Sequence, residues 1–264
     1  MLLTVDVGNT QTHLGVWRGD ELLREWRAST DPSRTADELA MLFSEFLSMV
    51  GIHFPADVSG LAASSVVPPA TREVRELAFR YVGAPAVVVE PGTKTGIAVL
   101  TENPREVGAD RIANAVAAHE MYPAENVVVV DFGTAITVDA VSLRGEYLGG
   151  AIAPGIETAA TALFQATAQI RRVELSEAPP CALGKTTVAS VQAGIIYGTA
   201  DMIDGLVERI TEEIGGPTRV ISTGGFAPSV SRYSNSIEAV EPTLTLTGLR
   251  LIYERNLERR EVGS

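Results

Sequence analysis

The feature that most constrains the fold is a short turn motif that occurs twice, 125 residues apart. Asp6-Val7-Gly8-Asn9-Thr10-Gln11-Thr12 recurs as Asp131-Phe132-Gly133-Thr134-Ala135-Ile136-Thr137, each time behind an apolar run. Asp, Gly and the second Thr match position for position, and a strand-like segment with an Arg-Gly-acid turn follows both copies. Self-similarity of this kind indicates a duplicated unit. The sequence therefore predicts two related domains, over residues 1–115 and 116–264.

The composition is that of a globular protein that does not bind nucleic acid. With 45% hydrophobic and 20% charged residues among 264, the chain can bury a sizeable core. The formal net charge of −12 leaves no basic stripe that could displace counterions from a nucleic acid. If the ligand is a nucleotide, its charge has to be met locally, by loop amides, helix N-termini, a metal ion and a few arginines.

The remaining global features favour a cytoplasmic protein without membrane contact. Cys181 is the one cysteine, so neither an internal disulfide nor a cysteine zinc cluster can form. The first residues lack the basic region of a signal peptide. No apolar run approaches the roughly 20 residues that a membrane-spanning helix needs.

Hydrophobic periodicity predicts the same order of elements in both halves. A capping box over Thr35–Glu38 begins a helix that ends at Gly51. The expected strands are 1–6, 13–17, 22–27, 58–64, 86–89, 127–131, 135–141, 146–149 and 219–223. The further expected helices are 71–81, one beginning between 108 and 119, 157–168, 187–214 with interruptions at its glycines, and 244–259.

The two turns are suited to hold phosphate groups and cations. A single Asp-x-Gly-Asn-Thr match would indicate no more than a β-turn, but two copies in the same context favour paired binding turns across a cleft. Gly8 and Gly133 let the backbone approach a ligand closely, and Asp6 and Asp131 offer hard oxygen ligands. Hydroxyl groups come from Thr10, Thr12, Thr134 and Thr137.

A set of collinear motifs over essentially the whole chain resembles the type III pantothenate kinases, within the superfamily of actin and hexokinase. These motifs are Asp6–Thr10, Ser64–Pro68, Asn103–Arg111, Asp131–Thr134, Gly149–Gly155, Gly184–Thr187 and Thr223–Gly225. The resemblance implies an α/β fold of two ribonuclease-H-like domains with an internal duplication and an interdomain cleft. It also implies phosphorylation of pantothenate to 4'-phosphopantothenate by ATP, the first step of coenzyme A biosynthesis, with Mg²⁺ and K⁺ or NH₄⁺. A homodimer with the substrate pocket at the subunit interface is implied as well.

On this resemblance the substrate residues are Gly108, Ala109, Asp110, Arg111 and Thr187. Asp110 is the proton acceptor for the primary hydroxyl of pantothenate, although the residues alone favour a helix N-cap there. Arg111 is either a surface charge or, as the resemblance implies, a bidentate clamp on the substrate carboxylate. Thr187 is a substrate contact or an ordinary helix N-terminal residue.

The resemblance likewise implies the nucleotide and cation contacts. Asp6 acts on the Mg²⁺ side through water, because Mg²⁺ keeps several of its waters. Asp131 is the ligand of the monovalent cation, and Thr134 contacts the phosphates. Gly224 and Gly225 let the backbone approach the adenosine, unless they form a plain strand-to-helix turn. The residues that wrap the phosphates are Asp6, Val7, Gly8, Asn9, Thr10, Gln11, Thr12 and His13.

Two departures from the family pattern concern the substrate pocket. Thr101 stands where some relatives carry tyrosine, and Arg171 replaces an expected proline. Two other functions stay open at this point: a kinase for a different small alcohol, and a non-enzymatic nucleotide-binding paralogue. The intact Gly108–Arg111 motif favours pantothenate, and the presence of Asp6, Asp110 and Asp131 favours an enzyme.

Overall fold

The chain forms two compact units in a computed structural model that describes residues 1–167 and 172–262, with side chains to residue 257. The first unit comprises residues 1–98, 102–117 and the C-terminal helix from Leu244. The second comprises residues 99–101 and 118–243. The C-terminal helix, which the sequence assigned to the domain 116–264, therefore lies in the first unit instead.

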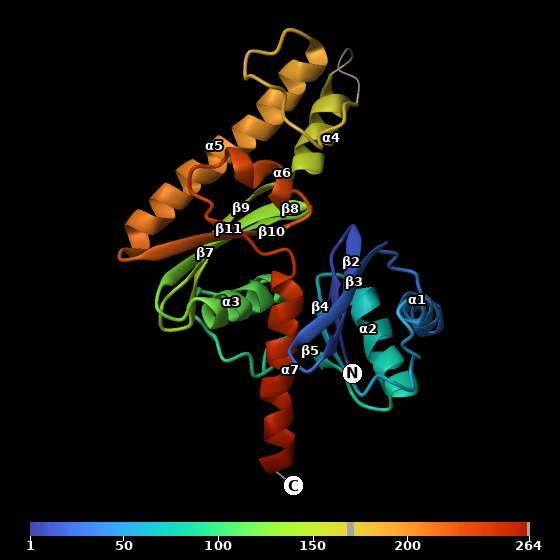
Figure 1. Ribbon diagram of the computed structural model, residues 1–264. Coiled ribbons are helices and arrows are strands. Elements are labelled where there is room, and N and C mark those ends of the chain that lie inside the picture. Colours follow the sequence, from blue (N-terminus) through green and yellow to red (C-terminus); the bar gives the residue numbers. More distant parts are fainter. Residues whose placement is uncertain (168–171, 263–264) are drawn as a thin grey trace. The chain divides into compact units, whose positions relative to one another are not determined.

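The first unit is built on a five-stranded sheet in the order β3-β2-β1-β4-β5. Its central strand β1 is antiparallel to β2 and parallel to β4. Helices α1 and α2 cover one face of this sheet, and α7 covers the other (Figure 1). The bounds are β1 Leu2–Val7, β2 Gln11–Arg18, β3 Glu21–Ser29, α1 Ala36–Ser48, β4 Gly60–Ser65, α2 Pro68–Leu77, β5 Val87–Val88 and α7 Leu244–Val262. A π-helical turn, Ala78–Val82, extends α2, and a 3₁₀ turn, Pro104–Glu106, precedes α3.

Side chains of β1 alternate between the two faces, as the period of two in a strand requires. Leu3, Val5 and Val7 are buried in the core beneath α1 and α2, whereas Thr4 and Asp6 point to the opposite face. The predicted capping box of α1 is confirmed. The Thr35 hydroxyl accepts from the Glu38 amide, and the Glu38 carboxylate accepts from the Thr35 amide at 2.8 Å.

Close backbone approach explains why α7 belongs to the first unit. A Cβ on Gly15 would lie 3.0 Å from the Leu246 side chain, and one on Gly248 would overlap the backbone of Ala113. Leu246, Leu249 and Ile252 are fully buried. The last helix therefore completes the face of the first sheet that α1 and α2 leave uncovered.

The second unit repeats this topology, which confirms the predicted duplication. Its sheet has the order β11-β10-β7-β8-β9-β6, in which β7 is antiparallel to β8 and parallel to β10. The order β9-β8-β7-β10-β11 is that of β3-β2-β1-β4-β5 in the first sheet. The strands are β6 Ala98–Val99, β7 Asn126–Phe132, β8 Ala135–Val141, β9 Glu146–Pro154, β10 Thr218–Gly224 and β11 Ala239–Val240. The helices are α3 Ala109–Met121, whose residues up to 117 belong to the first unit, α4 Ile156–Ala166, α5 Thr187–Ile214 and α6 Ala227–Val230, with a 3₁₀ turn at Ser231–Tyr233.

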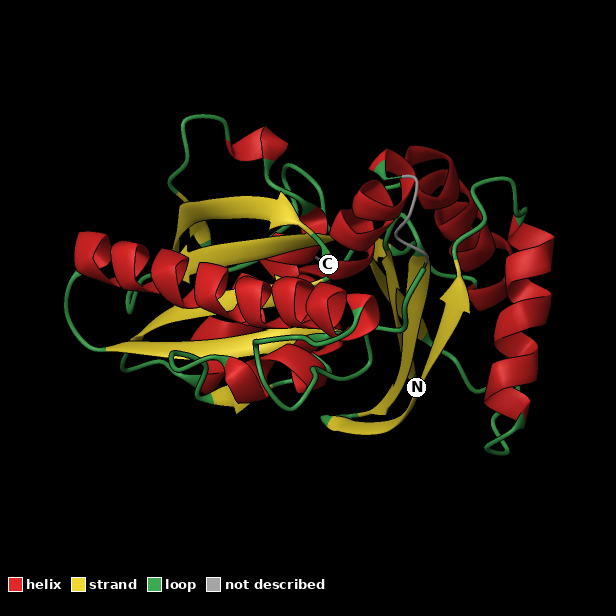
Figure 2. Cartoon of the chain, turned by 90° about the horizontal axis from the view of Figure 1, so that it is seen from above, coloured by secondary structure: helices red, strands yellow, loops and turns green. Residues whose placement is uncertain are grey.

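Helix α5 is continuous over 28 residues, so the predicted interruptions at its glycines are wrong. A glycine in a helix costs about 1 kcal/mol relative to alanine. Buried Ile196, Ile203 and Val207 on the sheet-facing side offset that cost. In Figure 2, which views the chain from above, α5 lies over the strands of the second sheet.

Candidate active site

The first turn connects β1 to β2 through residues 8–10. The Gly8 amide donates to the Gln11 carbonyl at 3.0 Å, and the Thr30 amide donates to the Thr10 carbonyl at 2.9 Å. Asn9, Thr10 and Gln11 are exposed at the tip. The loop is thus fixed at its base and presents backbone groups to the solvent, as a phosphate-binding turn requires.

Asp6 lies in a row of four polar side chains that crosses the first sheet on one face. Arg27 of β3 is opposite His13 of β2, His13 is opposite Asp6, and Asp6 is beside Ser64 of β4. The buried Ser64 hydroxyl donates to Asp6 Oδ1 at 2.7 Å and so orients the carboxylate. Oxygen atoms of this kind suit a hydrated Mg²⁺.

The imidazole in this row is buried and held by an acid. His13 is 7% exposed, and its Nε2 lies 2.8 Å from Glu25 Oε2. Burial and then the positive charge of Arg27 lower the pKa of His13, against the opposing influence of Glu25. A lowered pKa leaves the ring neutral at pH 7, and the neutral ring donates its Nε2–H to the Glu25 carboxylate.

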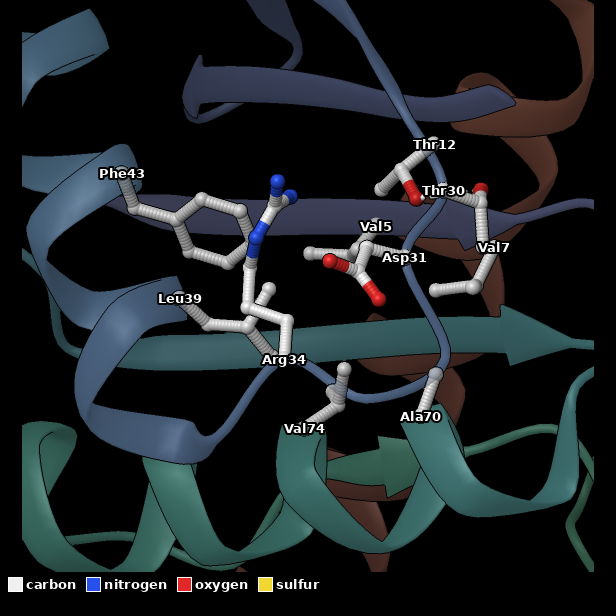
Figure 3. A pocket seen from close by; sticks show the side chains of 10 residues that line it. All are labelled: Val5, Val7, Thr12, Thr30, Asp31, Arg34, Leu39, Phe43, Ala70 and Val74. Atoms are coloured by element: carbon white, nitrogen blue, oxygen red, sulfur yellow. Dashed lines mark hydrogen bonds between the residues drawn. The ribbon is translucent and has the colours of Figure 1, made fainter. Parts of the chain in front are cut away.

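Thr12, one of the predicted phosphate-binding residues, points to the other face of the sheet. Its register partner is Val7, and its hydroxyl lies 2.9 Å from that of Thr30. Figure 3 shows both threonines on the wall of a cavity of about 10 Å³ with apolar side chains such as Val5 and Phe43. That volume is about what one water needs. The Thr12 side chain therefore does not share the face of Asp6.

The second turn connects β7 to β8 through Gly133 and Thr134. The Thr134 carbonyl accepts from the Gly155 amide at 3.1 Å and from the Thr158 hydroxyl at 2.7 Å. A Cβ on Gly155 would overlap the carbonyl groups of Gly133 and Thr134. The N-terminal end of α4 thus fixes this turn and leaves the Thr134 side chain exposed.

Asp131 lies in the equivalent row of the second sheet. Ile152 of β9 is opposite Thr137 of β8, Thr137 is opposite Asp131, and Asp131 is beside Thr223 of β10. The structural counterpart of Thr137 is therefore His13 and not Thr12, which corrects the match read from the sequence. The cause is the turn, which is one residue longer in the first copy and so shifts the pairing by one position.

Position 224, beside Asp131, has no room for any side chain and therefore requires a glycine. Its φ is +92°, and a Cβ there would lie 2.7 Å from Asp131 Oδ1 and 2.6 Å from the Phe132 carbonyl oxygen. The adjoining Gly225 has open space instead. The absence of a Cβ at Gly224 therefore lets its backbone pack against two oxygen atoms, a carboxylate and a carbonyl, and oxygen atoms of these kinds suit a monovalent cation chemically.

Asp110 is the second residue of α3 and not its N-cap. Its Oδ1 accepts from the Arg111 amide at 2.8 Å, and a Cβ on Gly108 would overlap that oxygen. Gly108 therefore leaves room for the carboxylate. The positive end of the helix macrodipole stabilises the charge of Asp110, which is half-buried.

The other predicted substrate residues lie at exposed or partly buried positions. Thr187 is the exposed first residue of α5, and Thr186 is the N-cap, accepting from the Ala189 amide at 3.1 Å. Arg111 is half-buried on α3. The buried Thr101 hydroxyl has no hydrogen-bond partner among the described residues, and the methyl group of the same side chain lies near Gly149. Arg171 lies outside the described residues.

Sequence reasoning missed a cavity of about 540 Å³ in the second unit. Its walls come from α4, the segment 172–176 and Phe226, which directly follows Gly224-Gly225. Phe164 and Leu175 supply apolar surface, and Glu157 and Glu174 are the acids. The spacing of Ala160 and Phe164 on one helix face was a signal for an apolar wall, but the sequence does not show which loop covers it.

The described residues contain no group of three or more histidine, cysteine, aspartate or glutamate side chains that could hold a metal ion. In the same part of the chain, no helix is both long and apolar enough to cross a membrane.

Comparison with known proteins identifies close relatives. The family model described as type III pantothenate kinase matches residues 2–209. The type III pantothenate kinase of Parafrankia sp. (strain EAN1pec) is 51% identical over 263 residues, covering 98% of this chain and 100% of that protein. That of Streptomyces griseus subsp. griseus is 52% identical over 268 residues, with coverage of 98% and 100%. Among solved structures, the activator of the 2-hydroxyisocaproyl-CoA dehydratase from Clostridium difficile with bound ADPNP has a TM-score of 0.56 at 11% identity, covering 98% and 97%, and shares the actin/hexokinase-like fold.

Proposed function

The chain belongs to the type III pantothenate kinase family, and on this premise we propose how its residues phosphorylate pantothenate with ATP in the first step of coenzyme A biosynthesis. The activity follows from the sequence identity of about one half between this chain and kinases of the family over nearly their full length. Phosphoryl transfer needs in-line positioning, neutralisation of charge and a group that takes the hydroxyl proton. The surroundings of Asp6, of Asp110 and of Asp131, each taken within its own unit, support one role for each.

Asp110 is the general base. Its carboxylate is fixed at the start of α3 by the Arg111 amide, and Gly108 leaves room beside it. It accepts the proton of the primary hydroxyl of pantothenate as that oxygen bonds to the γ-phosphorus of ATP, while the bond from this phosphorus to the β,γ-bridging oxygen breaks and ADP leaves. Gly108 and Ala109 line the approach, Arg111 binds the substrate carboxylate through two parallel hydrogen bonds, and Thr187 is a further substrate contact.

Replacement of Asp110 tests this role. Asp110→Asn keeps the shape of the side chain and removes the base, so we expect turnover to fall roughly 10²-fold or more while nucleotide binding stays nearly intact. Turnover is measured by coupled detection of ADP, and binding by titration with ADP. Turnover like that of the wild type would refute the role of Asp110.

The nucleotide is held by the two turns and by the segment after β10. Asp6, oriented by Ser64, would hold Mg²⁺ through water, and the loop from Val7 to Gln11 would contact the phosphates through its backbone. Thr12 contributes through its backbone, because its hydroxyl is paired with that of Thr30. His13 completes the first contact segment, Thr134 contacts the phosphates, and the adenosine lies along Gly224 and Gly225 with its base in the cavity next to Phe226.

A monovalent cation, K⁺ or NH₄⁺, is bound by Asp131. The Asp131 carboxylate and the Phe132 carbonyl, whose oxygen atoms both lie close to Gly224, support this assignment. A bound cation supplies positive charge that balances the phosphates. Asp131 and the backbone oxygen would hold it.

The family likeness also supports a homodimer in the cytoplasm with pantothenate as its small-molecule partner. The molar mass in solution, measured by light scattering, tests the dimer, and a mass of 28 kDa would contradict it.

The two alternatives drawn from the sequence, another small alcohol as acceptor and a non-enzymatic paralogue, are tested in one assay. Formation of ADP is followed with and without pantothenate, in sodium and then in potassium. Activity on sugars but none on pantothenate would overturn the substrate assignment.

A further inference from the structure

Arg27 is a free positive charge on the face of the first sheet that carries Asp6. It lies on β3 directly opposite His13, which in turn is opposite Asp6. The Arg27 side chain is exposed, and it forms no ion pair with any described residue. The positive charge of Arg27 nevertheless acts on its neighbour in the row, since it helps to lower the pKa of His13.

An acid that should neutralise Arg27 stands two residues away on the same strand and the same face. Glu25 and Arg27 are separated by the period of a strand, so their side chains project together. Glu25 is nevertheless bound to His13, whose Nε2 lies 2.8 Å from Oε2. His13 thus takes up the carboxylate that would otherwise pair with the guanidinium.

The electrostatic need for this charge is large. The chain has a net charge of −12 and must bind a polyanionic nucleotide. A guanidinium presents a fork of donors that fits phosphate oxygens, and it stays charged at any physiological pH. Because Glu25 is bound to His13, the Arg27 guanidinium is available to contact a phosphate group.

We propose that Arg27 binds a phosphate group of the nucleotide, and that His13 keeps Glu25 from neutralising it. This inference rests on the proposed nucleotide site and adds a contact that does not depend on a metal ion. Arg27 is the binding residue, and His13 and Glu25 set its availability. The phosphate of the product, 4'-phosphopantothenate, is the other source of the same chemistry, and the experiment separates the two.

The test measures binding of ADP, of adenosine and of 4'-phosphopantothenate by calorimetry, without metal ions. Arg27→Gln should weaken binding of ADP roughly tenfold or more and leave adenosine and 4'-phosphopantothenate unchanged, since a hydrogen-bonded charge pair to phosphate is lost. Arg24→Gln is the matched control. Arg24 is exposed on the same strand, but it is paired with Val16 and projects from the opposite face. This control should change the affinity for ADP less than twofold.

The role of His13 needs two further variants. His13→Ala frees Glu25 to pair with Arg27 and should weaken ADP roughly 3- to 10-fold. Adding Glu25→Gln to His13→Ala should restore most of the affinity. Failure of this rescue would show that His13 acts by direct contact and would overturn its proposed role.

The remaining outcomes separate this inference from the function on which it rests. Equal affinities for ADP in Arg27→Gln and Arg24→Gln would overturn the contact, while pantothenate turnover by the wild type would still support the kinase. Weakened binding of 4'-phosphopantothenate in place of ADP would overturn the nucleotide assignment. Absence of ADP binding by a folded wild type would count against the nucleotide site itself and against this contact with it.

Discussion

The rows of side chains around Asp6 and Asp131 occupy equivalent places in two sheets of the same topology, yet they differ in chemistry. Beside Asp6 stand a histidine, a serine and, farther out, an arginine. Beside Asp131 stand two threonines and, farther out, Ile152, which is 65% exposed. We propose that the first row serves a divalent cation and phosphate groups, and that the second serves a monovalent cation held by the Asp131 carboxylate and a backbone oxygen. Two sheets of the same topology thus carry chemically unlike rows of side chains.

The histidine of the first row follows from the length of one turn. The connection after β1 has one residue more than the connection after β7, and one position of shift turns every side chain of the next strand to the other face. His13 consequently stands where Thr137 stands in the second copy, and Thr12 takes the place of the buried Ile136. One residue of difference in the turn therefore decides which side chains of the following strand share the face of the aspartate.

The largest effect is expected at the carboxylate of the first row. Asp6→Asn removes the charge on the Mg²⁺ side, and we expect turnover to fall roughly 10²- to 10³-fold, as for other losses of preorganised electrostatic stabilisation. The dependence on magnesium should move to higher concentrations. Turnover measured over a magnesium titration checks this, and an unchanged titration curve would place Mg²⁺ elsewhere.

The corresponding change in the second row should affect a different ion. Asp131→Ala removes the proposed ligand of the monovalent cation, so activity in potassium should fall to the level seen in sodium. A potassium titration at fixed magnesium measures this. The comparison between the rows would break down if the variant were still activated by potassium as the wild type is.

A smaller effect is expected from the glycine pair next to Asp131. Gly224→Ala forces alanine to φ +92° and places a methyl group against Asp131 and Phe132, so the second unit should lose about 1–3 kcal/mol of stability. Gly225→Ala, one position on, meets open space and serves as the control. Denaturant unfolding compares the two, and equal losses would contradict the close approach at Gly224.

The smallest effect is expected at Thr12. Thr12→Val removes a hydroxyl that is paired with Thr30 on the core face, and we expect a loss of about 0.5–1.5 kcal/mol in stability. The KM for ATP should change less than about twofold. A large rise in this KM, measured at saturating pantothenate, would show that the hydroxyl binds phosphate and would contradict the assignment of Thr12 to the other face.

Local patterns predicted most of the elements, because they depend on neighbours in the chain. The capping box at Thr35–Glu38 and the alternation along β1 are examples, and the repeated turn predicted the duplicated topology. The continuity of α5 was not predictable, since burial of Ile196 and Ile203 against a distant sheet offsets its glycines.

The candidate site was predicted only in part, because the contacts of its residues also depend on segments that are distant in the sequence. The sequence motifs identified the family, which the relatives confirm, and they supplied the residues whose roles are proposed above. They could not show the partner of each residue. The face of His13 depends on hydrogen bonds within the turn, its bond to Glu25 depends on the register of β3, and the cavity next to Phe226 depends on a distant loop.

The place of α7 has a consequence for synthesis on the ribosome. The chain makes the first sheet early, but the helix that covers its second face is made only after the second unit, because Leu246, Leu249 and Ile252 follow residue 243, where that unit ends. Until they emerge, Gly15 and Trp17 have no cover on that side. We therefore expect the unit that begins the chain to finish folding after the unit that is encoded within it, so that a nascent chain passes through a state with an open apolar sheet, the kind of surface that chaperones bind.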